Sequence, residues 1–307
     1  MDLTEFHVTN LVRELICLVY ALGYTEVHCI ISHDFGTVPG SYAPLIRPDI
    51  FKSSIQVSIP FVAPGLPPLG IMASAKPPET LATAVHRFAI LENQLEKLHP
   101  PRKHYQWYNS GPTAANHWVS GGTLGLRAFF RGYFYLKSHN GPGNRVNPPK
   151  EFTAIALAVM PEYLLLPDSK TMPEVVESML QGQDPLVSEA WLSQKDLDVY
   201  VSEYQRSGFQ RNLNWYRVVT SKLEMARDTL ILAGAKLQVP TAFITGEQDW
   251  SSYLIPGSIE RYSESCTDFR GVTVIPNSGH WVPGEQPEAL LEAFVEFLDS
   301  LKRTGRT

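Results

Sequence analysis

Apolar positions recur along this chain with two different periods. Near the N-terminus they recur every three or four residues and predict an amphipathic helix over residues 3–22, with Gly23 in the position of a C-cap. Short segments rich in apolar residues at 27–31 (VHCII) and 55–59 (IQVSI) predict strands, with a helix over 38–46 between them. Helix and strand therefore alternate, and this alternation predicts an α/β fold with a mostly parallel sheet.

The pattern changes after the second strand. Residues 60–78 are rich in proline and glycine, which is the composition of a linker. The section that follows, up to residue 232, has many aromatic residues and no segment that predicts a strand. Its helical periods lie at residues 81–98, 124–135, 173–180, 193–207 and 215–232. This section is therefore expected to be a helical cap.

The α/β pattern returns near residue 239. The segment TAFITGEQD, residues 241–249, predicts a strand, and GVTVIPNSGHW, residues 271–281, predicts another strand followed by a loop. The last segment, residues 287–301, has one apolar helical face and predicts a closing amphipathic helix.

These patterns divide the chain into two parts. Residues 1–65 and 233–307 are expected to form a discontinuous core with a mostly parallel sheet, and residues 66–232 a helical cap domain. The fold class predicted is therefore α/β, with a cap inserted into the core.

Composition and charge exclude several classes of protein. The chain has 307 residues, 44% hydrophobic and 19% charged, which is enough for a core domain and a cap. The net charge of −5 leaves no basic surface for nucleic acid or anionic lipid. No run is apolar and long enough to span a membrane, and the chain does not open on a signal-peptide pattern, so a cytoplasmic protein is expected. Cys17 and Cys29 lie in apolar runs and are expected to be buried thiols of a reducing compartment.

Three reactive side chains each follow the end of a predicted strand. They are Asp34, within His-Asp-Phe-Gly, Asp249 and His280. The carboxyl ends of parallel strands meet at one edge of a sheet, where ligand sites form, so these three are expected to converge with the imidazole between the carboxylates. Their order along the chain, nucleophile, acid and histidine, is that of α/β-hydrolases, with an aspartate in place of the nucleophilic serine.

An aspartate nucleophile suits a different substrate from a serine. A carboxylate is already ionised at neutral pH and can displace a leaving group from saturated carbon, which leaves an alkyl ester on Asp34. His280, held by Asp249, would then activate the water that hydrolyses this ester. Epoxides and haloalkanes are the substrates that fit such a sequence of steps.

Two segments of the predicted cap bear on this choice, residues 103–112 (KHYQWYNSGP) and 207–217 (SGFQRNLNWYR). With them, the sequence resembles the soluble epoxide hydrolases of the α/β-hydrolase fold, and the resemblance covers nearly the whole chain. The similar motifs are His-Asp-Phe-Gly at 33–36, Arg-Pro-Asp at 47–49, Tyr-Gln-Trp-Tyr-Asn at 105–109, Leu-Asn-Trp-Tyr-Arg at 213–217 and Gly-His-Trp at 279–281.

The resemblance implies a role for each site residue. Asp34 is the expected nucleophile, Tyr105 and Tyr216 are the acids on the oxygen side of the epoxide, and Asp249 and His280 activate water. The resemblance also implies a wall of aromatic side chains around the substrate and an N–H donor for the oxyanion. The residues expected in these two roles are Phe35 (oxyanion hole and wall), Trp107 and Trp215, besides the two tyrosines.

The same enzymes carry a His-Gly-x-Pro loop upstream of the elbow, which supplies half of their oxyanion hole. This sequence opens instead with the helix before the elbow strand, so it is short at the N-terminus relative to the family. Losing one oxyanion donor typically costs about 2.7–4 kcal/mol in barrier, so hydrolysis of the ester is expected to be slow. The strand at 27–31 is expected to leave an apolar edge through which copies of the chain associate. An incomplete sequence, a non-catalytic homologue and a covering partner are alternative explanations.

Four functions stay open at this point. The leading one is hydrolysis of a small apolar epoxide by water to a vicinal diol. Haloalkane dehalogenation uses the same nucleophile but favours N–H donors over tyrosine hydroxyls. Epoxide-opening cyclisation would use Asp34 as a base, and a non-catalytic homologue would bind a ligand or a protein. No metal or organic cofactor is expected, because the sequence contains no P-loop, dinucleotide fingerprint or metal-ligand spacing.

Overall fold

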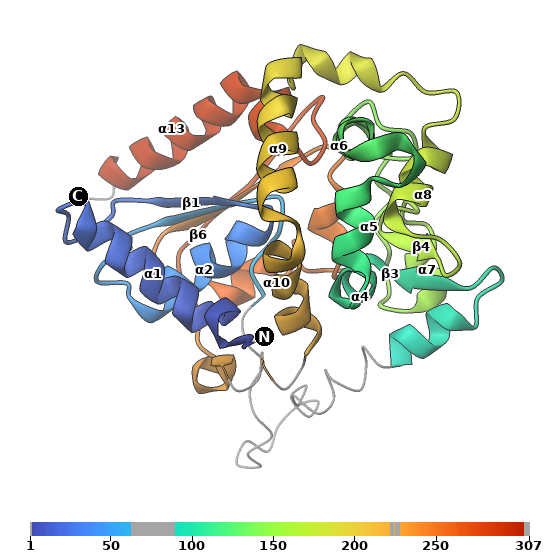
Figure 1. The fold of residues 1–307 in the computed structure, drawn as a ribbon. Coiled ribbons are helices and arrows are strands. Elements are labelled where there is room, and N and C mark those ends of the chain that lie inside the picture. The colour runs from blue at the N-terminus through green and yellow to red at the C-terminus, as the bar shows by residue number, and fades with distance from the viewer. Residues whose placement is uncertain (1, 63–89, 222–223, 225–227, 304–307) are drawn as a thin grey trace.

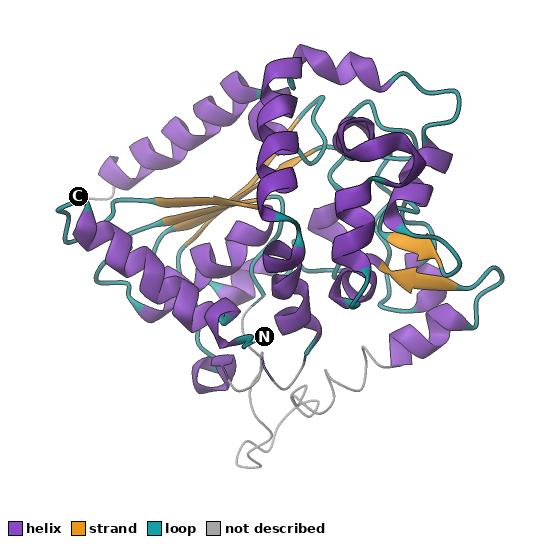
Figure 2. Ribbon diagram, viewed as in Figure 1, coloured by secondary structure: helices purple, strands orange, loops and turns teal. Residues whose placement is uncertain are grey.

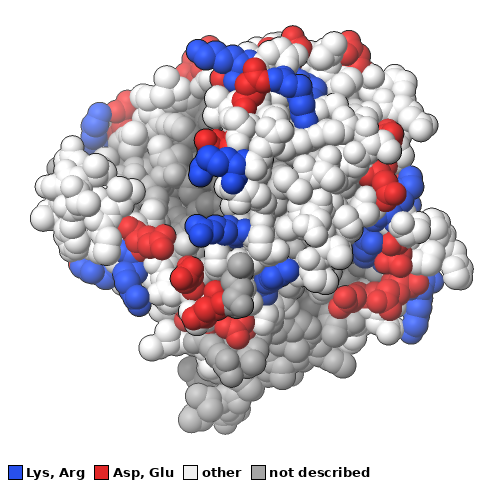
Figure 3. Space-filling view, viewed as in Figure 1, with Lys and Arg blue, Asp and Glu red and all other residues white. Residues whose placement is uncertain are grey.

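A computed structural model of the chain describes residues 2–62, 90–221, 224 and 228–303. Its parallel sheet and three helices occupy one side of the molecule, and a second group of helices occupies the other (Figure 1). The described residues include no helix that is long and apolar enough to cross a membrane. On the face drawn in Figure 3, acidic and basic side chains are interspersed, with no large area of one sign.

The sheet has the predicted parallel order. Its strands are β1 (Ile30–His33), β2 (Ser54–Val57), β5 (Thr241–Gly246) and β6 (Phe269–Ile275), arranged β1-β2-β5-β6 with every neighbouring pair parallel. The register pairs His33 with Val57 and Val57 with Ile244. Because the strands run the same way, their carboxyl ends, and the residues that follow them, lie along one edge of the sheet.

Three helices cover the two faces of this sheet. They are α1 (Val8–Ala21), preceded by the 3-10 turn η1 (Thr4–Phe6), α2 (Thr37–Ile46) and α13 (Pro287–Arg303). Phe243 of β5 packs in a cluster with residues of α1 and α2, whereas its neighbour Ile244 packs in a second cluster with residues of α13. This alternation along one strand explains why the run is apolar on both faces. Gly23 has φ of 83° just beyond α1, so the predicted helix end is confirmed.

The second group of elements has its own apolar core and is mostly helical (Figure 2). Its helices are α4 (Tyr105–Ser110), α5 (Ala114–Ser120), α6 (Gly125–Leu136), α7 (Ala154–Leu157), α8 (Met172–Met179), α9 (Gln194–Ser207) and α10 (Gln210–Thr220), with 3-10 turns η3 (Gly122–Leu124) and η4 (Pro185–Ala190). The predicted helical cap is therefore present. The helix expected over 81–98 begins outside the described residues. The domain boundary expected between residues 65 and 66 also lies outside them.

The prediction that the cap contains no strand is wrong. β3 (Arg102–His104) and β4 (Leu165–Pro167) form a two-stranded antiparallel sheet. Each strand has three residues, which is too short for an alternating apolar pattern, and the pairing joins segments about sixty residues apart. This small sheet has a consequence for the site, because the Tyr105 N–H, directly after β3, donates to the Leu164 carbonyl at 2.9 Å.

The prediction that Cys17 and Cys29 are buried is also wrong. Cys17 is exposed and Cys29 is partly buried, while Cys266 is buried. α1 turns Val12 and Val19 towards the core, and position 17 lies on another side of the helix at 3.6 residues per turn. An apolar run in the sequence therefore overstated how much of α1 is covered.

Candidate active site

The turn at the end of β1 presents Asp34. The strand ends at His33, and the chain passes through the 3-10 turn η2 (Asp34–Gly36) into α2. Asp34 has φ of 51°, in the left-handed region that residues other than glycine rarely occupy. The Thr37 hydroxyl fastens the turn by donating to the Asp34 carbonyl at 2.7 Å. A strained residue at a strand-to-helix turn is the geometry that lifts a nucleophile above the edge of a sheet.

The structure brings the three residues that follow strands together. Nε2 of His280 lies 3.2 Å from Oδ1 of Asp34, and Nδ1 of His280 lies 3.2 Å from Oδ1 of Asp249. The imidazole therefore stands between two carboxylates. Asp249 and His280 are each 1% exposed, whereas 35% of the Asp34 side chain is exposed. A ligand can thus reach Asp34 while the other two residues stay shielded from solvent.

Two serines donate hydrogen bonds to the carboxylate of Asp249. The Ser58 hydroxyl donates to Oδ2 of Asp249, and the Ser251 N–H donates to Oδ1 at 2.9 Å. Behind them, the Ser252 hydroxyl donates to the Ser58 carbonyl at 2.6 Å. Buried carboxylates need such donors to remain ionised, so this arrangement keeps Asp249 available to orient His280.

The charges of the three residues stabilise one another. Burial would raise the pKa of Asp34, but His280, Lys137 and His33 together hold it below its ordinary value. The pKa of Asp249 is lowered in the same way, against its burial, mainly by His280. Burial and Lys137 would lower the pKa of His280, yet the two carboxylates raise it. The site therefore keeps both carboxylates anionic, and these carboxylates stabilise the imidazolium form of His280.

The loop that carries His280 is held by hydrogen bonds to both the core and the cap. The carboxylate of Glu285, in the short helix α12 (Val282–Glu285), accepts the N–H groups of Gly279 and Trp281 at 3.0–3.1 Å. The His280 N–H donates to the Lys137 carbonyl at 2.9 Å, at the end of α6. The Trp281 indole donates to the carbonyl of Phe134 in α6, also at 2.9 Å. His280 is therefore fixed by the cap as well as by the core.

Tyr105 and Tyr216 come together from different helices of the cap. Tyr105 begins α4 and Tyr216 lies in α10, and their ring centroids are 5.8 Å apart. The ring of Phe35, next to Asp34 in the chain, lies 4.9 Å from that of Tyr216 in an edge-on contact. Burial raises the pKa of both phenols, and the Asp34 carboxylate raises them further. Both hydroxyls therefore keep their protons at neutral pH and can donate them.

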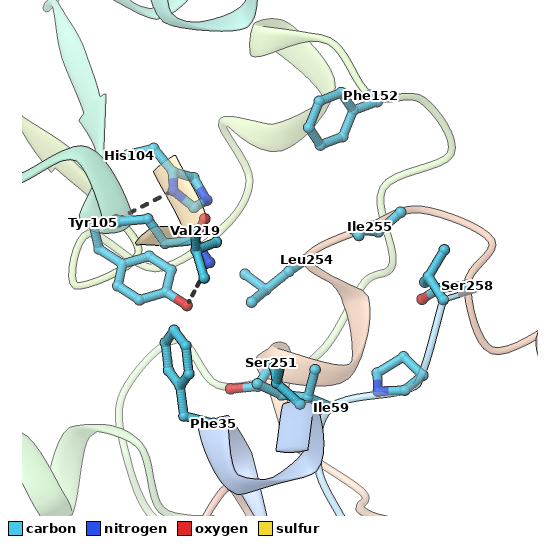
Figure 4. A pocket seen from close by; sticks show the side chains of 14 residues that line it. Phe35, Ile59, His104, Tyr105, Phe152, Val219, Ser251, Leu254, Ile255 and Ser258 are labelled. Carbon is cyan, nitrogen blue, oxygen red and sulfur yellow. Dashed lines mark hydrogen bonds between the residues drawn. The ribbon is translucent and has the colours of Figure 1, made fainter. Parts of the chain in front are cut away.

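An apolar cavity of about 220 Å³ opens beside Tyr105 and Phe35. Figure 4 shows the Tyr105 hydroxyl directed into it with the Phe35 ring next to this hydroxyl, and Gln106 Nε2 lies 3.4 Å from the hydroxyl oxygen. The remaining lining is almost entirely aliphatic or aromatic: Val38, Ile59, Pro60, Val62, Phe152, Val219, Leu254 and Ile255, with His104, Ser251 and Ser258. Such a cavity fits the apolar part of a small ligand.

The two tryptophans expected in the substrate wall lie in different places. The Trp215 ring is 5.4 Å from that of Phe35, so the structure brings it to the site. Trp107 instead lines a separate, polar cavity of about 340 Å³ together with side chains such as Glu96 and Lys103. The structure therefore does not bring Trp107 to Asp34. Among the described residues, no group of three His, Cys, Asp or Glu side chains is placed to hold a metal ion.

Sequence reasoning missed four residues around the triad: Ser58, Ser251, Lys137 and Glu285. Ser58 could have been found, because it directly follows β2 at the same edge of the sheet as Asp34 and Asp249. It was instead included in a predicted strand that ran to residue 59. Lys137 and Glu285 carry no such signal, since their place depends on how the cap packs on the core.

Comparison with known proteins finds epoxide hydrolases that are similar to this chain over nearly its whole length. No protein-family model matches it. Epoxide hydrolase B of Mycobacterium tuberculosis is 24% identical over 302 residues, which is 97% of this chain and 78% of that protein. Epoxide hydrolase A of the same organism is 35% identical over 119 residues, which is 39% of this chain and 35% of that protein.

Solved structures agree on the fold. An epoxide hydrolase from an endophytic Streptomyces has a TM-score of 0.73 at 20% identity, with 99% of this chain and 77% of that chain covered. Potato (Solanum tuberosum) epoxide hydrolase I has a TM-score of 0.64 at 20% identity, with 97% and 78% covered. The predicted α/β-hydrolase fold with a helical cap is therefore confirmed, and so is the resemblance to proteins of this group.

Proposed function

We propose that this chain, a homologue of the epoxide hydrolases of the α/β-hydrolase fold, hydrolyses an epoxide to a vicinal diol. One observation carries the proposal. Nε2 of His280 lies 3.2 Å from a carboxylate oxygen of Asp34, while the partly buried Tyr216 ring lies 4.9 Å from that of the neighbouring Phe35 and 5.8 Å from that of the buried Tyr105. A nucleophile, a base and oxygen-side acids are the groups that this reaction requires.

In the first step an oxygen of Asp34 attacks one carbon of the epoxide ring. The ring carbon–oxygen bond breaks, and the freed oxygen takes a proton from Tyr105 or Tyr216. The products are an alkyl ester on Asp34, a hydroxyl group on the neighbouring carbon and one tyrosinate. Ring strain and proton donation make this oxygen a competent leaving group, which a carboxylate nucleophile needs.

In the second step His280 removes a proton from a water molecule through Nε2. The water oxygen adds to the carboxyl carbon of Asp34, and the N–H of Phe35 supports the resulting oxyanion. The ester bond then breaks at this carbon, and the diol leaves with an oxygen that came from Asp34. The two water protons end on the departing diol oxygen and on the tyrosinate, so the net reaction adds one water to the epoxide.

The two-step mechanism predicts where an oxygen atom from isotopically labelled water ends after one turnover. A single turnover of styrene oxide in water labelled with the heavy oxygen isotope should give unlabelled diol and a labelled Asp34, read by peptide mass spectrometry. Label in the first diol would mean that water attacks the epoxide directly, and would overturn the ester mechanism.

Two variants separate the steps further. His280→Gln should accumulate the ester, seen as an intact-mass increase equal to one epoxide, with little diol. Asp34→Asn should show neither ester nor diol. A bromoalkane of similar size serves as the matched substrate control, because rapid halide release would favour dehalogenation over epoxide opening. If the unmodified chain forms neither adduct nor diol, the non-catalytic alternative is favoured.

We further propose that the substrate is apolar on the side that faces the cavity beside Tyr105. Its wall is built from Phe152, Val219, Leu254 and Ile255 among others. Burial of apolar area there contributes roughly 25 cal/mol per Å². Leu254→Asp should therefore raise KM for styrene oxide far more than KM for glycidol, a polar epoxide that leaves this wall uncovered. Equal changes for both epoxides would contradict the proposal.

We also propose that copies of the chain associate through the outer edge of β1. This strand ends the sheet formed by the described residues, and Ile31 is 45% exposed on it. An exposed apolar edge strand favours pairing with another copy. Ile31→Lys should shift the sedimentation coefficient to that of a monomer, while Val199→Lys, a matched change at an exposed position in α9, should not. A wild-type chain that sediments as a monomer at all concentrations would refute this.

A further inference from the structure

Lys137 is held at the junction between the cap and the His280 loop. It caps the C-terminus of α6, and its carbonyl accepts the His280 N–H at 2.9 Å. Its ammonium nitrogen lies 5.1 Å from the centroid of the Trp281 ring and 5.6 Å from that of Tyr133. Cation–π contacts of this length are attractive, so the side chain has a defined position beside the histidine loop.

The Trp281 ring, which carries the Lys137 ammonium over its face, lies 4.6 Å from the His280 imidazole between ring centroids, so the Lys137 charge is close to the triad. Among the described residues, no carboxylate forms an ion pair with it within 4.0 Å. Burial lowers the pKa of Lys137, and the carboxylates of Asp34 and Asp249 raise it in turn. Lys137 acts on the same groups: it helps to keep Asp34 anionic and disfavours the charged form of His280.

We propose that Lys137 is a positioning residue that keeps His280 neutral while the Asp34 ester is hydrolysed, an inference that rests on the proposed function. In the proposed reaction the charges around His280 differ before and after the ester forms. Before the epoxide reacts, the imidazole lies between two anions. After the reaction Asp34 is an uncharged ester, and only Asp249 still stabilises the imidazolium.

Lys137 has its main effect after the ester has formed, when Asp34 is uncharged. The charge of Asp249 favours a protonated imidazole, which cannot accept a proton from water. The nearby ammonium opposes that charge, so the neutral imidazole is populated at the stage that needs a base. No side chain needs to move for His280 to become neutral, because formation of the ester removes the Asp34 charge that favoured the imidazolium.

The other groups that face His280 do not supply this effect. His33, at the end of β1, has its ring centroid 5.0 Å away, but burial lowers its pKa, so it is neutral near pH 7. Ser58 and Ser251 approach Nδ1 with uncharged hydroxyls at 3.0 Å and 3.2 Å. Glu285 binds the main chain of the loop and adds negative charge. Among the charged groups that the structure describes around the imidazole, Lys137 is the cation.

The test is the pH profile of ester hydrolysis in Lys137→Met, with Lys137→Arg as the matched control that keeps the charge. The ester is formed rapidly with excess styrene oxide, and its decay is followed by quenched intact-mass measurements between about pH 5 and pH 9, the range in which histidines titrate. The acid midpoint should move up by about one unit in Lys137→Met, as expected for removal of one nearby charge. The rate on the alkaline plateau should stay within about threefold of wild type, and the arginine variant should keep the wild-type midpoint.

The possible results separate the inference from the function on which it rests. An unchanged midpoint in Lys137→Met, with or without a lower plateau, would show a structural role only and overturn the inference. Absence of both ester and diol in the wild-type chain would refute the proposed function instead. If Lys137→Met does not fold, Lys137→Gln removes the same charge with a side chain of similar length and decides between the same two results.

Discussion

The hydroxyl oxygen of Ser58 lies 3.0 Å from Nδ1 of His280 and donates a hydrogen bond to Oδ2 of Asp249. One side chain thus contacts both the base and the acid that orients it. Ser58→Ala should slow hydrolysis of the ester by roughly 10- to 100-fold, because a hydrogen bond to a charged group contributes about 1.5–3 kcal/mol. Alkylation of Asp34 should change little, and rapid-quench measurement of each step checks this.

The backbone of Ser58 allows a control for that variant. Its φ is 82°, a conformation that glycine adopts without steric cost. Ser58→Gly removes the same hydroxyl but relieves the strain, so it should be about 1 kcal/mol more stable than Ser58→Ala by urea unfolding. Its defect in ester hydrolysis should be equal. If only Ser58→Ala is slow, strain rather than the hydroxyl is responsible.

Tyr105 and Tyr216 should affect the first step. Phenylalanine at either position removes one proton donor and should slow alkylation by about 10²–10⁴-fold, the usual contribution of a general acid. The double variant should form no detectable ester. Single-turnover alkylation with styrene oxide measures this, and Tyr204→Phe, a tyrosine packed on Phe209 within the cap, is the control that should alkylate normally. Normal alkylation in the double variant would remove both residues from the mechanism.

The two steps should also differ in their response to pH. The pKa of Asp34 is held below its ordinary value, and those of Tyr105 and Tyr216 are raised above 10. Alkylation should therefore vary little between about pH 5 and pH 9. Ester hydrolysis needs neutral His280 and should fall about tenfold per pH unit below its midpoint. The ester should accumulate in acid during steady-state turnover, and a common acid limb for both steps would contradict this.

The His280 loop should tolerate no side chain at Gly279. A Cβ there would lie 2.5 Å from the Lys137 carbonyl oxygen and 2.5 Å from the carbonyl carbon of Ser138. These are backbone atoms of one segment and cannot give way, so Gly279→Ala should destabilise the protein by about 3 kcal/mol and lower activity. Gly36→Ala is the control: no atom lies within 4 Å of its added Cβ, and thermal unfolding should show stability equal to wild type or slightly higher.

The parts of the fold that could be predicted are those that a local pattern of apolar and polar residues indicates. Strand runs ending in Asp34, Asp249 and His280 predict both the parallel sheet and the edge where these residues meet. The β3–β4 pair could not be predicted, because each strand is three residues long and its partner is remote in the chain. The exposure of Cys17 was misjudged for a related reason, since periodicity identifies a helix but not how much of it a neighbour covers.

The candidate site was predictable only for residues that a strand end or a family motif marks. Ser58 is marked by a strand end but was hidden by a boundary error of two residues. Lys137 and Glu285 depend on contacts between cap and core segments that are more than 140 residues apart in sequence. A single sequence has no signal for such contacts, which arise from packing rather than from local propensity.

The hydrogen bonds between the His280 loop and α6 limit how this protein could be redesigned. His280 and Trp281 each donate to α6 carbonyls, and the His139 N–H donates to Glu285 at 2.7 Å. A cap exchanged for that of another protein would bring carbonyls of a different spacing and release His280. Chimeras should therefore exchange the cap and residues 277–285 together. In directed evolution the two segments should likewise be varied and recombined together.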